Sequence, residues 1–435
     1  MTGARFPSGP TVVVHAPNWT ARHEAAFDWV LSAALGLSWR WEDDAAAFRS
    51  EDGVRMHYGL EGEWPGVGFP ADGLLDRTGS LDAEPPAHEG EQADLFSAVF
   101  WMASRMEEFL PDAPRDDHGR FDPTGSLPEL KGWLDSPICE RWAWTIGERL
   151  LGDAWPEHRE RLRAEHAVVP TLDVDSAYAF RGKGLVRTGG AWVRDVLRGQ
   201  WGQAGRRLRV ATGGAHDPYD TYDRVEEAHR SRGLTTQWFF LLAAFGSHDK
   251  GLPASSPALA DLMKRLDRLE GHAVGWHPGY ASASDPGKMA AEHRSFLDIL
   301  GRPPVASRQH YLRMVPSETR RQLLALGVRE DHTEGHAVRA GWRGGFARPR
   351  RWYDLERETL TNLELVPFAA MDATYLRYLR TPASEVPARV GVLADEARKW
   401  GAPLRLLWHN ESLSGEGQWA GWEVVYTQTL DAACR

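Results

Sequence analysis

The chain has 435 residues, of which 42% are apolar and 26% are charged, and its formal net charge is −10. This length exceeds what one compact core usually supports and therefore predicts two domains. The acidic balance argues against a nucleic-acid partner, because phosphate binding requires a basic surface. The two cysteines, Cys139 and Cys434, lie far apart in the sequence, which disfavours both a disulfide framework and a thiolate zinc site.

The location of the protein is indicated by the absence of long apolar segments. No apolar run in the sequence approaches the length of a membrane span. The first residues, Met1-Thr-Gly-Ala-Arg-Phe-Pro7, lack the apolar core of a signal peptide. We therefore expect a soluble cytoplasmic protein. The sequence predicts no particular oligomeric state.

Residues 1–165 are predicted to form a smaller mixed α/β domain of unknown role. Strands are expected at residues 11–15 and 37–41, and helical periodicity covers residues 24–35 and 94–110. The second domain is expected to cover residues 166–435, where apolar strands alternate with amphipathic helices, as in a parallel α/β sheet or barrel.

The candidate strands of the second domain cover residues 168–173, 235–242, 273–277, 305–310, 326–330, 363–367 and 404–409. Seven strands with connecting helices fit one (β/α) barrel. Residues 201–222, which are rich in Gly, Arg and Asp, are expected to form an insertion over the barrel mouth.

The first of these strands runs directly into two carboxylates, Asp173 and Asp175. Side chains two residues apart on a strand point the same way, so both carboxylates can face one pocket at the strand's C-terminal end. The C-terminal ends of barrel strands are where α/β barrels keep their chemistry. The alternative interpretation is a strand that ends in a solvated acidic turn.

Three other predicted strands end in a histidine, namely His277, His310 and His409. A lone histidine at a strand end is more often a hydrogen-bonded structural residue than a ligand. Three of them, gathered with two carboxylates at one barrel mouth, predict a site for a divalent metal. Zinc is the first choice, with cobalt, nickel or manganese as alternatives.

These motifs resemble those of a known family. The order Thr171-Leu-Asp-Val-Asp175, Gly271-His-Ala-Val-Gly-Trp-His277, Arg308-Gln-His-Tyr311 and Leu404-Arg-Leu-Leu-Trp-His409 is similar to the polysaccharide deacetylases of the NodB-homology type (carbohydrate esterase family 4-like). The resemblance implies a distorted seven-stranded (β/α) barrel that removes acetyl groups from glycans with a bound divalent metal. Residues 1–165 resemble an uncharacterised N-terminal domain found ahead of such barrels in bacterial proteins.

The resemblance also implies roles for individual residues. Asp173 matches the family's catalytic base and His409 its general acid, while Asp175 and His277 match metal ligands. The family's second ligand histidine falls on Ala281, which is a departure from the pattern.

His310 stands where the third motif of the family usually has a proline. We expect His310 to replace the missing ligand and so to restore an Asp-His-His triad. The alternative is that His310 only packs or hydrogen-bonds at the mouth.

Two arginines are candidates for holding the base. Arg308 matches the arginine of the third motif and is expected to orient Asp173 or to bind substrate; alternatively it pairs with Asp331. Arg339 could tether the same carboxylate or could be a surface residue.

The candidate substrate-binding residues are Tyr311, Trp276 and Trp408, which flank the proposed site and could stack on sugar rings. A core position is the alternative for the tryptophans. By analogy with the family, the backbone N–H of Tyr311 could also stabilise an oxyanion. The segment 248–250 could reach the mouth, although a charged loop is the simpler interpretation.

The predicted function is metal-assisted hydrolysis of an amide or ester, with a carbohydrate substrate that loses an acetyl group. An alternative is a catalytically impaired barrel that acts as a glycan-binding or assembly protein. A third possibility, a hydrolase for a small non-sugar amide, shares the site but not the substrate.

Overall fold

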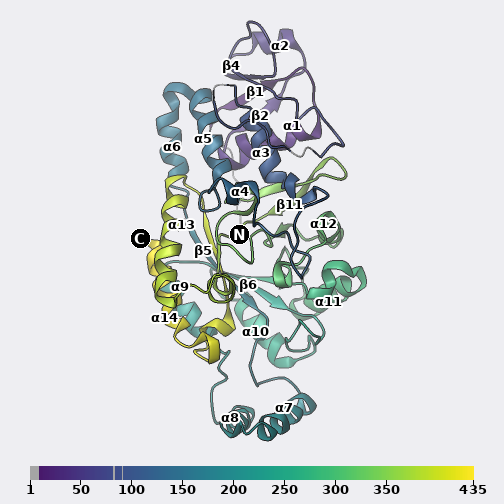
Figure 1. The fold of residues 1–435 in the computed structure, drawn as a ribbon, viewed down its shortest axis with the longest axis vertical. Coiled ribbons are helices and arrows are strands. Elements are labelled where there is room, and N and C mark those ends of the chain that lie inside the picture. The colour runs from purple at the N-terminus through teal and green to yellow at the C-terminus, as the bar shows by residue number, and fades with distance from the viewer. Residues whose placement is uncertain (1–8, 82–83, 91) are drawn as a thin grey trace. The chain divides into compact units, whose positions relative to one another are not determined.

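The computed structural model of the protein describes residues 9–81, 84–90 and 92–435 (Figure 1). The N-terminal segment discussed above, residues 1–7, lies outside the described residues. The chain folds into two compact units. The first unit comprises Met1–Ala167, Glu334–Ala369 and Val392–Leu404, and the second comprises Val168–Thr333, Ala370–Gly391 and Arg405–Arg435. The contacts thus place two later segments with the first unit, whereas the sequence suggested one division near residue 165.

A parallel four-stranded sheet, in the order β2-β1-β3-β4, lies in the first unit. The strands are β1 Thr11–His15, β2 Ser38–Trp41, β3 Val54–Tyr58 and β4 Val67–Phe69. Strand β1 has the predicted bounds, and β2 falls within the predicted 37–41. The apolar side chains of β1, such as Val12 and Val14, are fully buried in the core of the first unit.

Helices surround this sheet within the first unit: α1 Ala21–Phe27, α2 Ala45–Ser50, α3 Leu95–Ser104, α4 Leu127–Leu130, α5 Ile138–Leu151 and α6 Trp155–Arg163. A π-helical stretch, Asp28–Ala34, continues α1. The predicted helix 94–110 is interrupted, because Arg105 has a left-handed φ of 59° and the chain continues as a 3-10 turn, Met106–Phe109.

The predicted strand 363–367 forms, but it begins earlier than expected and pairs differently. It is the end of β11, Thr359–Leu365, which lies antiparallel to β10, Arg350–Asp354. Both strands of this hairpin belong to the first unit. The short connection between them explains the antiparallel pairing, because a parallel pair needs a crossover of a dozen or more residues.

The second unit is built on a large, mainly parallel sheet. Its strands follow one another in the order β9-β8-β7-β6-β5-β13-β12. Their bounds are β5 Val168–Val174, β6 Thr236–Leu241, β7 His272–His277, β8 Ala306–Ser307, β9 Glu330–Asp331, β12 Ala370–Met371 and β13 Leu404–His409. Four of the predicted strands match closely. The predicted strands 305–310 and 326–330 are each reduced to two residues, and the chain turns into a 3-10 segment at His310.

The helices of the second unit are α7 Leu185–Leu197, α8 Trp201–Ala211, α9 Tyr222–Arg230, α10 Pro257–Asp267, α11 Pro286–Leu300, α12 Pro316–Ala325 and α14 Trp422–Cys434. The first part of helix α13, Val386–Lys399, belongs to the second unit, and the part from Val392 onward belongs to the first. The Gly- and Arg-rich insertion predicted at residues 201–222 is largely helical.

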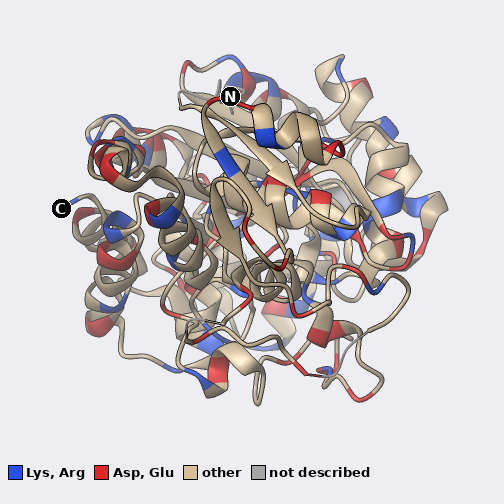
Figure 2. Ribbon diagram, turned by 90° about the horizontal axis from the view of Figure 1, so that it is seen from above, with Lys and Arg blue, Asp and Glu red and all other residues tan. Residues whose placement is uncertain are grey.

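Acidic and basic residues are interspersed along much of the ribbon (Figure 2). Among the described residues, no helix is both long enough and apolar enough to cross a membrane.

Candidate active site

The sheet order of the second unit explains why distant residues meet. Strands β5, β6, β7 and β8 are parallel neighbours, so their C-terminal ends lie along one edge of the sheet. Asp173 lies in β5 and Asp175 directly follows it, while His277 ends β7. On the other side of β5, His409 ends β13.

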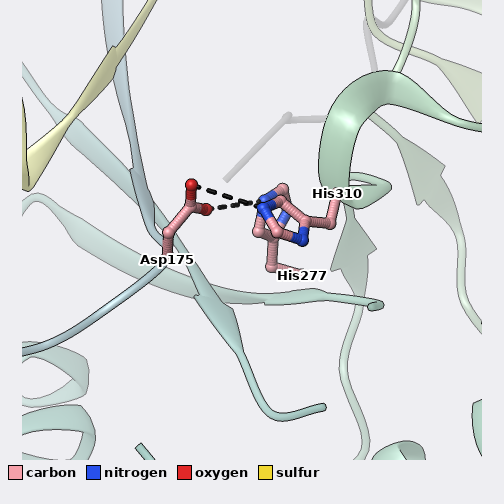
Figure 3. Close-up of side chains that lie close together, drawn as sticks. All are labelled: Asp175, His277 and His310. Carbon is pink, nitrogen blue, oxygen red and sulfur yellow. Dashed lines mark ion pairs between the residues drawn. The ribbon is translucent and has the colours of Figure 1, made fainter. Parts of the chain in front are cut away.

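Asp175, His277 and His310 form a cluster in which one potential ligand atom of each residue lies within 4.8 Å of the others (Figure 3). The Oδ1 atom of Asp175 is 3.3 Å from Nε2 of His277, and its Oδ2 atom is 3.3 Å from Nε2 of His310. Both imidazoles are buried. The structure therefore brings together the three residues that the sequence suggested as ligands.

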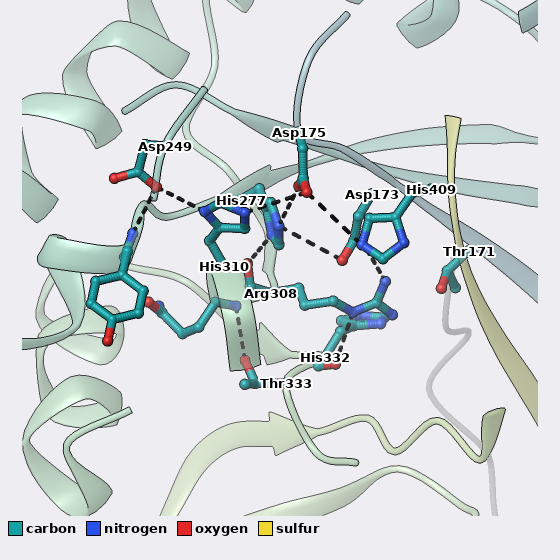
Figure 4. A network of polar contacts seen from close by, with 12 residues as sticks. Thr171, Asp173, Asp175, Asp249, His277, Arg308, His310, His332, Thr333 and His409 are labelled. Carbon is teal, nitrogen blue, oxygen red and sulfur yellow. Dashed lines mark hydrogen bonds and ion pairs between the residues drawn. The ribbon is translucent and has the colours of Figure 1, made fainter. Parts of the chain in front are cut away.

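Each imidazole of the cluster is oriented by its other nitrogen. The Nδ1 atom of His277 donates to the main-chain carbonyl of Arg308. The Nδ1 atom of His310 donates to Oδ1 of Asp249, 2.7 Å away (Figure 4). Such partners fix the tautomer of a metal-binding histidine, and here they leave both Nε2 atoms directed at Asp175.

This donor set fits a divalent cation. One carboxylate and two imidazoles suit zinc and its first-row neighbours. The Oδ1 atom of Asp175 and the Nε2 atom of His277 are buried and have no hydrogen-bond partner in the described structure. Buried polar atoms normally have a partner, so these two atoms indicate a place for a ligand.

The cluster's protonation reflects its concentrated charge. Burial on its own would lower the pKa of His310, but the carboxylates of Asp175 and Asp249 raise it to about 9. Burial would raise the pKa of Asp175, whereas His310 and His277 hold it well below its usual range. A bound cation would have to displace the proton of His310, because only the neutral imidazole is a ligand.

Asp173 lies beside the cluster and is held by an arginine. Its Oδ1 atom accepts a 2.7 Å hydrogen bond from Nη1 of Arg308, and its Oδ2 atom is 3.7 Å from Nε2 of His277. Arg308 is fully buried, and its Nε atom donates to the carbonyl of His332. Of the two partners considered for Arg308, the hydrogen-bonded one is thus Asp173; Asp331 instead accepts from Arg320.

His409 lies on the side of Asp175 away from His277 and His310, as Asp173 does, with its Nε2 atom 4.0 Å from Oδ2 of Asp175 (Figure 4). Asp372 accepts hydrogen bonds from both the Nδ1 atom and the backbone N–H of His409, each at 2.8 Å. Burial would lower the pKa of His409, but the negative charges of Asp372, Asp175 and Asp173 raise it to about 10. The imidazole is therefore charged at neutral pH and can donate a proton.

An aromatic group lies next to His310. The ring of Tyr311 contacts that of His310, with centroids 4.7 Å apart, and those of His248 and Tyr280 at 5.4 Å. Tyr311 and Leu312 both have left-handed backbone angles, with φ of 62° and 54°. Such conformations are costly for residues other than glycine and tend to occur at functional sites.

Three predicted site residues have other surroundings. Trp276 and Trp408 are completely buried, so their rings occupy interior positions and not exposed platforms for a sugar. Each precedes its histidine by one residue on a strand, and consecutive side chains point to opposite faces. Arg339 forms an ion pair with Glu129 of the first unit at 2.9 Å, whereas the guanidinium that holds Asp173 is that of Arg308.

Two carboxylates of this network are new relative to the predicted site. Asp249 lies in the segment 248–250, for which the sequence allowed either a position at the mouth or a charged loop, and its carboxylate contacts His310. Asp372 directly follows β12 and was not considered. The signal for Asp372 is present in the sequence, since an apolar run, Val366-Pro-Phe-Ala-Ala-Met371, ends in an aspartate just as the run before Asp173 does.

Comparisons with known proteins give a family model that matches part of the chain and solved structures of low sequence identity. Residues 12–156 match the model of a family of unknown function, DUF7033. No curated protein matches the sequence. Similar solved structures include a protein assigned as a polysaccharide deacetylase from Mycobacterium smegmatis, with 14% identity, a TM-score of 0.39, and coverage of 62% of this chain and 84% of the other.

The Puue allantoinase is 13% identical, with a TM-score of 0.37 and coverage of 62% and 85% of the two chains. A polysaccharide deacetylase from Bacillus cereus is also 13% identical, with a TM-score of 0.29 and coverage of 61% and 87%.

Proposed function

We propose that the protein is a metal-dependent, deacetylase-like hydrolase that removes an acetyl group from a sugar or glycan precursor. The main support is the cluster of Asp175, His277 and His310, with two oriented imidazoles whose Nε2 atoms face one carboxylate. A candidate base and a candidate acid lie beside this cluster: Asp173 is 3.7 Å from His277, and His409 is 4.0 Å from Asp175.

The three cluster residues would hold the cation, for which zinc is the first choice and cobalt, nickel or manganese are alternatives. When bound, such an ion polarises an acyl carbonyl and lowers the pKa of a coordinated water. Asp173, held by Arg308, accepts the proton of the attacking water. His409, kept charged by Asp372, donates a proton to the departing amine or alkoxide, and the backbone N–H of Tyr311 would stabilise the oxyanion.

The same proposal includes the architecture suggested by the sequence. The seven predicted strands of residues 166–435 would form a distorted (β/α) barrel, these residues would act as the catalytic domain, and the protein would work in the cytoplasm. Ala281 supplied the reason to consider a glycan-binding protein without a metal. His310 fills the third position of the cluster, which favours the enzyme.

Metal analysis and acetate release test this proposal together. We expect purified protein loaded with Zn²⁺ or Co²⁺ to retain one ion per chain, and Asp175→Ala and His277→Ala to lose it. Asp173→Asn should keep the ion but release no acetate from a panel of acetylated sugars, because the base is removed while the ligands remain. Failure to bind any divalent ion would contradict the enzyme and favour the glycan-binding alternative.

Release of product from non-sugar amides, but from none of the acetylated sugars, would instead identify the third alternative. An exposed residue outside the site provides the control: Asp285→Asn should change neither metal content nor turnover, because Asp285 caps helix α11.

A further inference from the structure

One segment of the second unit has a charge opposite to that of the whole chain. Residues 181–210 contain eight lysines and arginines and a single aspartate, although the chain carries a formal net charge of −10. This segment includes α7 and α8, which are joined by three residues and lie side by side (Figure 1). The proposed reaction uses none of these residues.

Helix α7 separates its apolar and basic residues onto different faces. At 100° per residue, Trp192, Val193 and Leu197 fall within one sector, and Arg194 and Arg198 fall in the neighbouring sector. The three apolar side chains are exposed, by 41% at Trp192, 50% at Val193 and 81% at Leu197. An isolated exposed apolar residue needs no explanation, but a row of them does.

Helix α8 also exposes apolar side chains on one face. Trp201 and Leu208 are seven residues apart and therefore share a face, and their side chains are 67% and 58% exposed. Arg207 and Asp195 form a buried ion pair between the two helices, with Nη2 and Oδ2 2.8 Å apart. This pair fixes the helices to each other while their apolar residues remain exposed.

The pair of helices is also tied to the rest of the second unit. Arg187 donates to the carbonyls of Lys250 and Gly251, each at 2.8 Å. Asp217 accepts hydrogen bonds from the backbone N–H groups of residues 179–181, just before α7. The exposed surface is thus held by specific contacts at both of its connections.

We propose that α7 and α8 dock the protein onto an anionic membrane surface. Exposed Trp and Leu side chains suit the boundary between head groups and acyl chains, and the surrounding arginines suit anionic lipid head groups. Neither helix is long enough to span a bilayer, so the binding would be peripheral. A nucleic acid would use the positive charge but would leave the row of aliphatic side chains without a partner, which favours lipid.

Vesicle co-sedimentation of the full-length protein tests this proposal. We expect binding to phosphatidylcholine vesicles that contain phosphatidylglycerol, and at least a tenfold weaker binding to phosphatidylcholine alone. A variant with Trp192→Ser, Leu197→Ser and Trp201→Ser should lose binding by about tenfold or more, and so should Arg194→Glu, Arg198→Glu and Arg209→Glu. Both variants should keep the wild-type thermal unfolding midpoint, because the substituted side chains are exposed.

Matched controls change the same chemistry elsewhere. Lys264→Glu, Arg268→Glu and Arg294→Glu make the same charge change, and Leu130→Ser, Val392→Ser and Val424→Ser remove exposed apolar side chains. Both controls should bind anionic vesicles like the wild type. Hydrogen exchange on the unmodified protein supplies an independent readout, with vesicle-induced protection expected at residues 185–211.

Absence of binding to anionic vesicles would overturn the proposal, as would equal losses in the control variants or protection outside residues 185–211. Tighter binding to an RNA homopolymer than to anionic vesicles would assign the surface to nucleic acid instead. These outcomes do not depend on hydrolase activity, so they separate this proposal from the function proposed above.

Discussion

The proposed metal centre depends most on His310. This residue would replace the second ligand histidine of the family, whose position is occupied by Ala281 in this chain. His310→Ala removes one of three ligands and leaves Asp175 and His277 in place. We expect metal affinity to fall on the order of 100-fold or more. Loss of a group that only hydrogen-bonds to a metal ligand already lowers metal affinity by about 10–100-fold, and loss of the ligand itself should lower it further. Competition between the protein and a chromophoric chelator for Zn²⁺ measures this loss, and an unchanged affinity would remove His310 from the metal shell.

We expect Asp249 to influence a cation bound at the proposed site only through His310. Asp249→Asn keeps the size of the side chain but removes the negative charge opposite Nδ1 of the imidazole. We expect metal affinity to fall by about 10–100-fold, with the same ligands still present. The chelator competition used for His310→Ala provides the measurement. The double variant Asp249→Asn/His310→Ala should bind zinc as tightly as His310→Ala alone. If Asp249→Asn weakens zinc binding as much in the His310→Ala variant as in the wild type, Asp249 does not act through this imidazole.

For individual residues, the sequence indicated the carboxylates and histidines that lie at the site. It was less informative about the side chains that hydrogen-bond to them. Asp173, Asp175, His277 and His409 stand at or next to strand ends, and strand ends can be recognised from apolar runs. Asp372 follows a two-residue strand, whose short apolar run gives a weak signal. The link between Asp249 and His310 depends on the course of a loop, which the local sequence does not determine.

Among the secondary-structure elements, α9, β6 and α14 are joined by one buried histidine. His229 Nδ1 hydrogen-bonds to Thr236 Oγ1 at 2.6 Å, and its Nε2 atom hydrogen-bonds to the hydroxyl of Tyr426. Burial is the main reason that the pKa of His229 is lowered from 6.5 to about 3. The ring is therefore neutral in the folded protein at pH values where it is charged in the unfolded chain.

This histidine makes stability fall as the solution is acidified. Between pH 6.5 and pH 3 the unfolded state binds the proton and the folded state does not, so the free energy of unfolding rises with pH in this window. We expect His229 alone to cost about 2 kcal/mol between pH 6.5 and about pH 5, at 1.36 kcal/mol per pH unit. Urea unfolding at several pH values should show a flatter dependence for His229→Gln. His216→Gln, a change at an exposed histidine, should keep the wild-type slope.

The elements themselves were predicted where their sequence pattern is long. Strands β1, β5, β6, β7 and β13 have five to seven residues, at least three of them apolar, and their bounds were close to those predicted. Strands β8 and β9 have two residues each, since a strand lasts only as long as its neighbour supplies hydrogen bonds. Strand β10 was not predicted, so the antiparallel hairpin that it forms with β11 was missed, because strand pairing is a long-range property.

For the whole molecule, the proposed ligands are far apart in the sequence, at positions 175, 277 and 310. An unfolded chain cannot present them together, so a cation bound at this site should stabilise the folded state. At a free Zn²⁺ concentration about 100 times the dissociation constant, the gain should be about 2.7 kcal/mol. Differential scanning calorimetry should show a higher unfolding midpoint with Zn²⁺ and its reversal by a chelator.

The matched variant for this measurement is Asp175→Ala, which should unfold at the same temperature with and without the ion. A zinc-induced shift that persists in Asp175→Ala would place the stabilising cation elsewhere. Residues 334–369 and 392–404 lie with the first unit through contacts between residues far apart in the chain, and chain length and composition carry no information about such contacts.

The Nδ1 atoms of the two imidazoles of the cluster have different hydrogen-bond acceptors, and this difference limits how mutation could change the metal preference of the proposed site. The anchor of His277 is a peptide oxygen, which every amino acid at position 308 would supply, whereas the anchor of His310 is the carboxylate of Asp249. Mutation can therefore adjust the electron-donating strength of only one of these two rings without replacing the ring itself. Natural variation or protein engineering aimed at metal preference should accumulate at position 249, while the environment of His277 stays constant.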